Sequence, residues 1–308
     1  MTEERLFALL GKRLEADPKR SLKPVRLPPY DPEGGPYHKV QYVIELVGTQ
    51  LIPGDAARRL LKSRHKSSLG DPEIYVMVPG QRRWKALWTG EDAITYDSLA
   101  LAWDLVSSRG ALSEGPAKEL WKRAERVAKS WKRRAMPLPP PEDAAKAAQN
   151  LKAVQESLDV GVHVLLRTRS GAIPTQAAIE AAYSLGFRMR ANDLLEWWQS
   201  GWSEPILWIH SMDEDGTFRP SQRSSIPGLA VGYSVPCSPS PEEVMERTFL
   251  AADGLAGQLG ASVFDDEALP LSPKRRTEMR SNLQGALDTF DRIGLTPGSP
   301  EALRLFEP

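Results

Sequence analysis

The stretch "RSGAIPTQAAIEAAYS", residues 169–184, decides the fold class of this chain. It predicts a helix that opens with Ile-Pro, because proline is favoured in the first turn of a helix. The apolar side of this helix is formed at helical spacing by Ala178, Ile179, Ala182 and Tyr183. The preceding residues, "VGVHVLLRT" (160–168), are apolar and β-branched and predict a strand. A domain therefore opens here with a strand followed by a helix.

The same pair of elements occurs once earlier in the chain. The stretch "GTQLIPGDAARRLLKS", residues 48–63, aligns with residues 169–184 without a gap, and a predicted strand at 40–48 precedes it. Later elements recur in the same order: strands at 98–106 and 228–236, apolar-striped helices at 117–131 and 245–259, and proline-containing turns that open third helices at 136–154 and 269–287. This order indicates an internal duplication. The alternative is two unrelated α+β domains with similar patterns.

Each copy reads β-α-β-β-β-α-(β-β)-α, which predicts an α+β fold. We expect two tandem split β-α-β domains, each a mostly antiparallel sheet with helices on one face and the other face uncovered. The predicted division is a helix and a Pro-rich arm at 1–38, one domain at 39–157 and a second at 158–308. Within the first part, the Pro- and Gly-rich residues 17–38 predict an extended segment without regular structure.

The composition excludes several classes of protein. A membrane span needs about 18 consecutive apolar residues, and the sequence has no such run. The opening "MTEERLFALLGKRL" is charged throughout, so we expect no signal peptide and a cytoplasmic protein. The single cysteine, Cys237, cannot form an internal disulfide. No metal site or cofactor is expected, because ligand spacing is absent among the four histidines, His38, His65, His163 and His210.

The net charge of zero hides an asymmetry between the two halves. Residues 1–156 carry 27 Lys and Arg against 20 Asp and Glu, whereas residues 157–308 carry 13 against 20. A basic half makes nucleic-acid binding an alternative function. Its basic residues lie mostly along one predicted helix, "KELWKRAERVAKSWKRRA" (118–135), where a solvated outer face is the commoner explanation. Nucleic acid is therefore not the expected partner.

An acidic stretch, "SVFDDEALPLSP" (262–273), could suggest catalysis or metal binding. Its three acids stand between two short apolar runs, which predicts a tight hairpin, since Asp bonds nearby backbone amides in turns. Ser272 and Pro273 then fit the N-cap and first position of a helix. No enzyme activity is expected, because the sequence shows no Gly-rich phosphate loop, no nucleophile with a recognisable base and no metal-ligand cluster.

Residues 158–306 contain five segments that occur in one characteristic order. They are "DVGVHVLLRT" (159–168), "AAYSLGF" (181–187), "DEDGTFRPSQRSSIPGLAVGYSVP" (213–236), "LGASVFDDEALPLSPKRRTEMRSNL" (259–283) and "IGLTPGSPEALRLF" (293–306). This part of the chain resembles the C-terminal domain of ZipA, the bacterial cell-division family that binds the C-terminal tail of FtsZ. Residues 39–157 resemble that family only through the second copy and are interpreted as a degenerate copy.

The resemblance implies a non-enzymatic protein whose open sheet face forms a shallow apolar groove for a peptide. The implied partner is the FtsZ C-terminal tail or another disordered protein segment. An adaptor or dimerisation protein of the same fold with a different partner is the alternative. The sequence does not predict the oligomeric state, and the membrane segment that precedes the domain in ZipA has no counterpart in residues 1–38.

Period-two alternation predicts which residues line the groove. If Leu229, Val231 and Tyr233 face the helices, the residues between them face outward. The predicted set is His163, Leu165, Leu194, Trp198, Trp208, His210, Met212, Ala230, Gly232 and Ser234, with Leu194, Trp208 and Met212 as anchors. Family members often carry a large apolar residue where this chain has Gly232, so we expect part of the groove floor to be missing. Burial of this face against the first copy is the alternative.

Overall fold

The computed structural model describes most of the chain, namely residues 2–29, 34–88, 95–190 and 193–306. These residues form two compact units. The first unit contains the described residues of 29–157 together with 303–306, and the second contains residues 2–28 together with the described residues of 158–302. The predicted arm thus divides, because its first 28 residues belong to the second unit.

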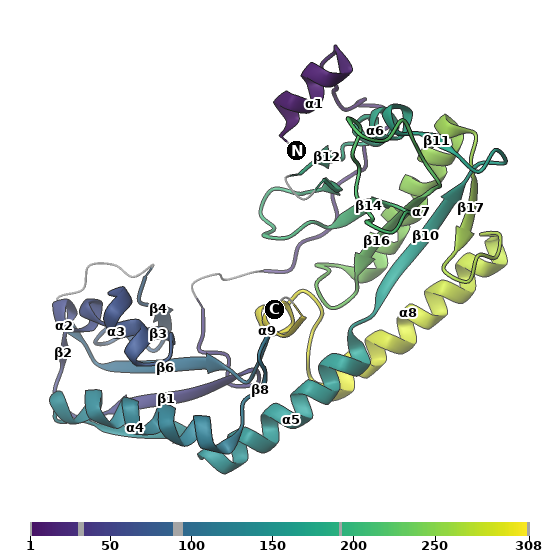
Figure 1. The fold of residues 1–308 in the computed structure, drawn as a ribbon. Helices are drawn as coiled ribbons and strands as arrows, with labels where there is room; N and C mark the ends of the chain where they lie inside the picture. Colours follow the sequence, from purple (N-terminus) through teal and green to yellow (C-terminus); the bar gives the residue numbers. More distant parts are fainter. Residues whose placement is uncertain (1, 30–33, 89–94, 191–192, 307–308) are drawn as a thin grey trace. The chain divides into compact units, whose positions relative to one another are not determined.

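The second unit is built on a six-stranded antiparallel sheet. Its strands, in spatial order, are β12 (Arg188–Met189), β13 (Leu195–Trp197), β14 (Leu207–Ser211), β16 (Leu229–Ser234), β10 (Gly161–Arg167) and β17 (Ser262–Asp265). Helix α7 (Pro241–Leu259) packs against β10, β16 and β17 and also contacts α6 (Thr175–Ser184) and α8 (Pro273–Ile293) (Figure 1). The expected α+β class is confirmed.

The first unit is built on a five-stranded antiparallel sheet. Its strands, in spatial order, are β4 (Trp84–Ala86), β3 (Glu73–Met77), β6 (Ser98–Asp104), β1 (Gln41–Val47) and β9 (Arg134–Leu138). Alanines of α4 (Glu114–Ser130) and α5 (Pro141–Leu158) share a buried core with one face of this sheet, which presents Ile44, Leu99 and Leu101. A small β7–β8 hairpin (Val106–Ser107, Gly110–Ala111) precedes α4.

The central strands of the two sheets correspond. The order β6-β1-β9 in the first unit matches β16-β10-β17 in the second. Ile44 lies opposite Leu101 in one sheet, as Val164 lies opposite Val231 in the other. The outer strands differ in their order along the chain. In the first sheet β3 lies beside β6 and comes before β4, the next strand outward. In the second sheet β14 lies beside β16 and comes after β13, the next strand outward. An internal duplication, which stays an inference, predicts this central correspondence.

The Ile-Pro pairs do not form the first helical turn, contrary to the prediction. Ile52–Pro53 (β2) pairs with Thr95–Tyr96 (β5), and Ile173–Pro174 (β11) pairs with Ser225–Ile226 (β15). The ψ angles are extended, 133° at Pro53 and 124° at Pro174, so each proline stands at the N-cap and the helix begins at the next residue. The two isoleucines are 1% and 0% exposed, and the short pairings hold them in the core.

The alignment of residues 48–63 with 169–184 also predicts one helix over 52–63, and the observed helix is shorter. Helix α2 covers Gly54–Arg59, and a separate helix, α3, covers Ser63–Ser68. The backbone N–H of Leu60 and that of Leu61 bond carbonyls three residues earlier, which tightens the end of α2 and turns the chain.

The acidic stretch forms the predicted turn and also anchors a helix. The N–H of Asp265 donates to the carbonyl of Leu269 at 2.9 Å, which closes a hairpin. Asp265 itself is fully buried, and its carboxylate accepts the N–H of Leu269 at 2.8 Å and the guanidinium of Arg275. Ser272 caps α8 by accepting the N–H of Arg275 at 3.2 Å. Asp265 thus links the hairpin to α8.

The N-terminal segment is part of the second unit. Helix α1 (Glu3–Leu10) buries Leu6 completely, and the Phe7 ring lies edge-on to that of Tyr183 at 5.9 Å between centroids. Further along, the side-chain amide of Gln199 accepts from and donates to the backbone of Val25, both at 2.9 Å. Residues 17–28 of the predicted extended segment therefore lie on the folded domain.

Candidate functional site

The sheet of the second unit has an inner face toward α7 and an outer face opposite to it. Val164, Val231 and Tyr233 lie on the inner face, where the Tyr233 hydroxyl donates to the carbonyl of Pro241 at 2.9 Å. Strand β14 alternates between buried and half-buried residues. Leu207 and Ile209 are buried on the inner face, and Trp208 and His210 are half-buried on the outer face. The alternate residues of each strand therefore form the outer face.

Strand register brings the predicted residues of the outer face into two rows. Glu196, Trp208, Gly232 and His163 lie opposite one another on β13, β14, β16 and β10. His210, Ala230, Leu165 and Phe264 form the next row on β14, β16, β10 and β17. Six of the ten predicted residues lie in these two rows. Ser234, which pairs with Gly161 beside the first row, is the seventh in a strand on this face.

The position of Gly232 is occupied by a neighbour. A Cβ atom placed on Gly232 would lie 2.7 Å from Cδ2 of His163 and 2.7 Å from the carbonyl oxygen of Val162. The imidazole of His163 therefore lies directly on the glycine, in the place where an apolar side chain is expected in the family. Ala230 in the next row is only 6% exposed. These two small residues shape the face without presenting much surface.

His163, Trp208 and His210 form a cluster above Gly232. The ring centroid of His163 lies 6.4 Å from that of Trp208 and 6.0 Å from that of His210. Burial lowers the pKa of both histidines. At His163 the negative charge of Asp266 partly offsets this lowering of the pKa. At His210 repulsion from a protonated His163 lowers the pKa further. Nε2 of His210 is buried without a hydrogen-bond partner among the described residues. The cluster therefore favours neutral imidazoles and an apolar ligand.

A charged pair at the edge of the outer face was missed from the sequence. The carboxylate of Glu196, a residue only 7% exposed, accepts the indole N–H of Trp198 at 2.8 Å. The guanidinium of Arg190 lies 5.2 Å from the Trp198 ring centroid, and its Nε lies 3.8 Å from Glu196. Period-two alternation could have placed Glu196 on the outer face, because it stands between the predicted outward residues Leu194 and Trp198. A buried carboxylate was not expected there.

The other predicted residues lie at strand ends. Leu194 comes just before β13 and is half-buried, whereas Trp198 follows β13 and is 36% exposed. The N–H of Met212 donates to Gly228 at 3.1 Å, and its sulfur lies 2.8 Å from where a Cβ of Gly228 would stand. The three predicted anchors are thus half-buried, and their role in binding stays a prediction.

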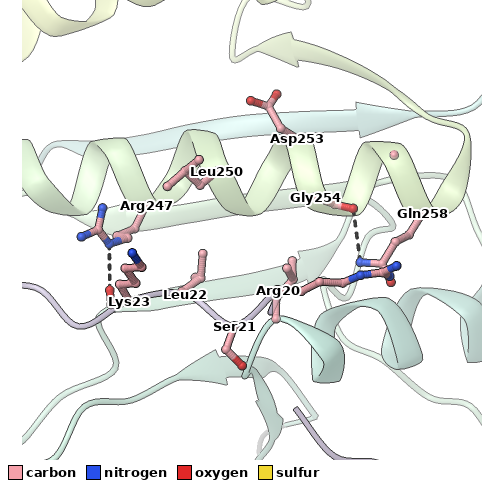
Figure 2. Close-up of a pocket in the computed structure, with 11 residues that line it drawn as sticks. Arg20, Ser21, Leu22, Lys23, Arg247, Leu250, Asp253, Gly254 and Gln258 are labelled. Atoms are coloured by element: carbon pink, nitrogen blue, oxygen red, sulfur yellow. Dashed lines mark hydrogen bonds between the residues drawn. The ribbon is translucent and has the colours of Figure 1, made fainter. Parts of the chain in front are cut away.

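A cavity of about 680 Å³ lies on the helix side of the same unit (Figure 2). Figure 2 shows residues 20–23 of the N-terminal segment facing α7, where Arg247 donates to the carbonyl of Lys23 at 2.7 Å. The lining of the cavity contains Leu250, Gly254 and Gly257 but none of the predicted groove residues. The cavity is a gap beneath the docked segment.

Metal-binding groups and membrane-spanning helices are both absent from the described residues. No group of three or more His, Cys, Asp or Glu side chains among them could hold a metal ion. Within the same residues, every helix is too short or too polar to cross a membrane.

Comparison with known families gives a match for part of the second unit. Residues 160–282 match the model of the ZipA C-terminal, FtsZ-binding domain. The match runs from the start of β10 into α8 and includes both rows of the outer face. A search of the curated proteins gave no match. The resemblance inferred from the sequence is confirmed for these residues, and the degenerate copy at 39–157 stays a prediction.

Proposed function

We propose that this protein, which carries a ZipA-type domain at residues 160–282, is a bacterial cell-division factor that binds the C-terminal tail of FtsZ. Binding takes place without catalysis, in the cytoplasm, on the outer face of the second unit. The tail is captured as a short disordered segment that becomes ordered on the sheet.

The observation that carries this proposal is the row of Trp208, Gly232 and His163 inside the matched segment. A half-buried tryptophan beside a buried glycine offers an aromatic anchor with little side-chain entropy to lose. Neutral imidazoles next to it reduce the cost of covering this surface with apolar side chains. The Glu196–Arg190 pair at the edge supplies charges that orient the peptide.

The test is a fluorescence-anisotropy titration of a labelled FtsZ C-terminal tail peptide into the full chain, with a scrambled peptide beside it. We expect saturable binding that weakens at least about ten-fold in Trp208→Ala, which is the effect of losing a central aromatic anchor. Trp88→Ala is the matched control, because Trp88 is 67% exposed and belongs to the first unit. Equal affinity in both variants contradicts the proposed face, and no binding by the unaltered chain contradicts FtsZ as the partner.

The basic half of the chain gives weaker support for nucleic-acid binding. On α4, Lys118 lies 2.5 Å from Glu114 and Lys122 lies 2.8 Å from Glu119. Part of the positive charge of this helix is therefore already paired with carboxylates of the same helix. Such pairs are typical of a solvated helix face.

A further inference from the structure

The outer face of the first unit, opposite α4, carries an arginine from the end of the chain. Nη2 of Arg304 lies 2.7 Å from the Glu73 carboxylate, and Nη1 lies 3.4 Å from Asp104. The guanidinium carbon lies 5.1 Å from the ring centroid of Tyr37. Arg304 thus joins β3, β6 and the segment before β1, from which it is separated by 200 residues or more.

The first unit holds these carboxylates in place with its own side chains. Glu73 accepts the hydroxyl of Tyr75 at 2.5 Å and the amide of Gln41 at 3.0 Å. Gln41 is fully buried, also donates to Asp104 at 3.4 Å, and accepts the N–H of Tyr37 at 3.0 Å. This network holds the two carboxylates and the Tyr37 segment together through contacts that do not involve Arg304.

The charges of the site require a cation. Burial raises the pKa of Asp104. Burial also raises the pKa of Glu73, but hydrogen bonds from Tyr75 and Arg304 outweigh it and hold that pKa below its ordinary value. Two partly buried carboxylates repel each other when no cation lies between them. A guanidinium fits because its planar fork can bond both carboxylates and stack on a ring.

The residues on either side of Arg304 add apolar contacts. Leu303 is 7% exposed and Leu305 is 2% exposed. The side-chain amide of Gln155 donates to the carbonyl of Leu305. The bound segment, Leu303–Phe306, therefore combines one arginine with flanking leucines and a backbone anchor.

Within its own sheet, this site lies on the face that corresponds to the outer face of the second sheet. Ala102 opposes Val43 on the outer face of the first sheet, as Gly232 opposes His163 in the second. The first sheet was expected to leave this face uncovered, yet Val43, Ala100 and Ala102 are at most 1% exposed. Within this unit, Gly35 lies against the Tyr75 ring and Arg304 lies between Glu73 and Asp104.

The segment that carries Arg304 is short. Helix α9 (Pro300–Phe306) has seven residues and follows a turn containing Pro297 and Gly298. A helix this short has little stability of its own. Its release is a local opening, which costs less free energy than unfolding the unit.

We propose that the outer face of the first unit is a second peptide-recognition site, specific for a short apolar segment with one arginine, and that residues 303–306 of the same chain occupy it. The site is closed to other ligands while this segment is bound. The proposal does not depend on FtsZ, because it rests on the contacts of residues 303–306 within the first unit.

The test uses a labelled peptide of residues 299–308, "SPEALRLFEP", titrated into the full-length chain. In the Arg304→Glu chain, repulsion from Glu73 and Asp104 releases the resident segment, so the peptide is expected to bind at least ten-fold tighter than to the unaltered chain. Adding Glu73→Gln to this variant should remove the gain. A peptide that itself carries Arg304→Glu should not bind. Arg292→Glu, an exposed arginine of α8, is the matched control and should behave as the unaltered chain.

Circular dichroism establishes that each variant is folded, and Arg304→Gln is the milder second variant should Arg304→Glu unfold. Equal peptide affinity in the folded variants and the unaltered chain overturns the proposal, as does retained binding of the Glu-substituted peptide. The unaltered chain could instead form dimers that dissociate when free peptide is added. That result overturns the proposal that the site is occupied by residues 303–306 of the same chain, because the segment then comes from a second copy.

Discussion

The two imidazoles of the outer face, His163 and His210, lie 6.0 Å apart between ring centroids, and burial lowers the pKa of both below the ordinary value of about 6.5. The unfolded chain therefore binds protons near pH 6.5 that the folded chain takes up only at lower pH. Their contribution to the free energy of unfolding is fully present above the unfolded pKa and is lost as the pH falls toward the folded values. Asp266 beside His163 reduces this loss without reversing its sign.

We therefore expect the free energy of unfolding to fall between pH 7.5 and pH 5, and to fall less in His210→Gln. Urea denaturation at several pH values measures it. His65→Gln is the control, because His65 is exposed on α3. The same pH dependence in both variants contradicts the assignment of the effect to the outer face.

At the scale of one element, the hairpin before α8 contains two adjacent aspartates in opposite environments. Asp265 is fully buried and bonds the N–H of Leu269 and the guanidinium of Arg275, whereas Asp266 is exposed. We expect Asp265→Ala to lower the free energy of unfolding by about 2–4 kcal/mol, since it removes a charged hydrogen bond and a turn bond. Asp266→Ala should change it by less than about 0.5 kcal/mol. Chemical denaturation of the two variants checks this difference, and equal effects contradict the role of Asp265.

Alternation and turn chemistry predicted much of the second unit. The outward positions on β14 and β16, the hairpin at 262–271 and the cap at Ser272 all follow from local sequence. Two features could not be obtained in this way. The Ile-Pro pairs form strands because they pair with residues about 40 to 50 positions away. Arg304 meets Glu73 across 231 positions, and periodicity carries no information about such a contact.

At the scale of the whole chain, the second unit is assembled from two separated segments. Residues 2–28 precede the entire first unit in the sequence, yet they bury Leu6 and Val25 in the second. The family match at 160–282 does not include them. Residues 2–28 therefore contribute to the core of the unit that contains the family match, and we expect residues 158–302 alone to be less stable than the whole unit.

The N-terminal helix makes this dependence measurable, because α1 carries one buried and one exposed leucine. Leu6 is 0% exposed and Leu9 is 48% exposed. Leu6→Ala should lower the free energy of unfolding by about 2–4 kcal/mol, through lost burial and the cavity left behind. Leu9→Ala should lower it by less than about 1 kcal/mol. Chemical denaturation followed by tryptophan fluorescence checks this difference, since Trp197 and Trp202 are buried in the second unit and contribute to the signal. If the two variants unfold at the same denaturant concentration, α1 is not part of the core, and residues 158–302 are sufficient for the fold.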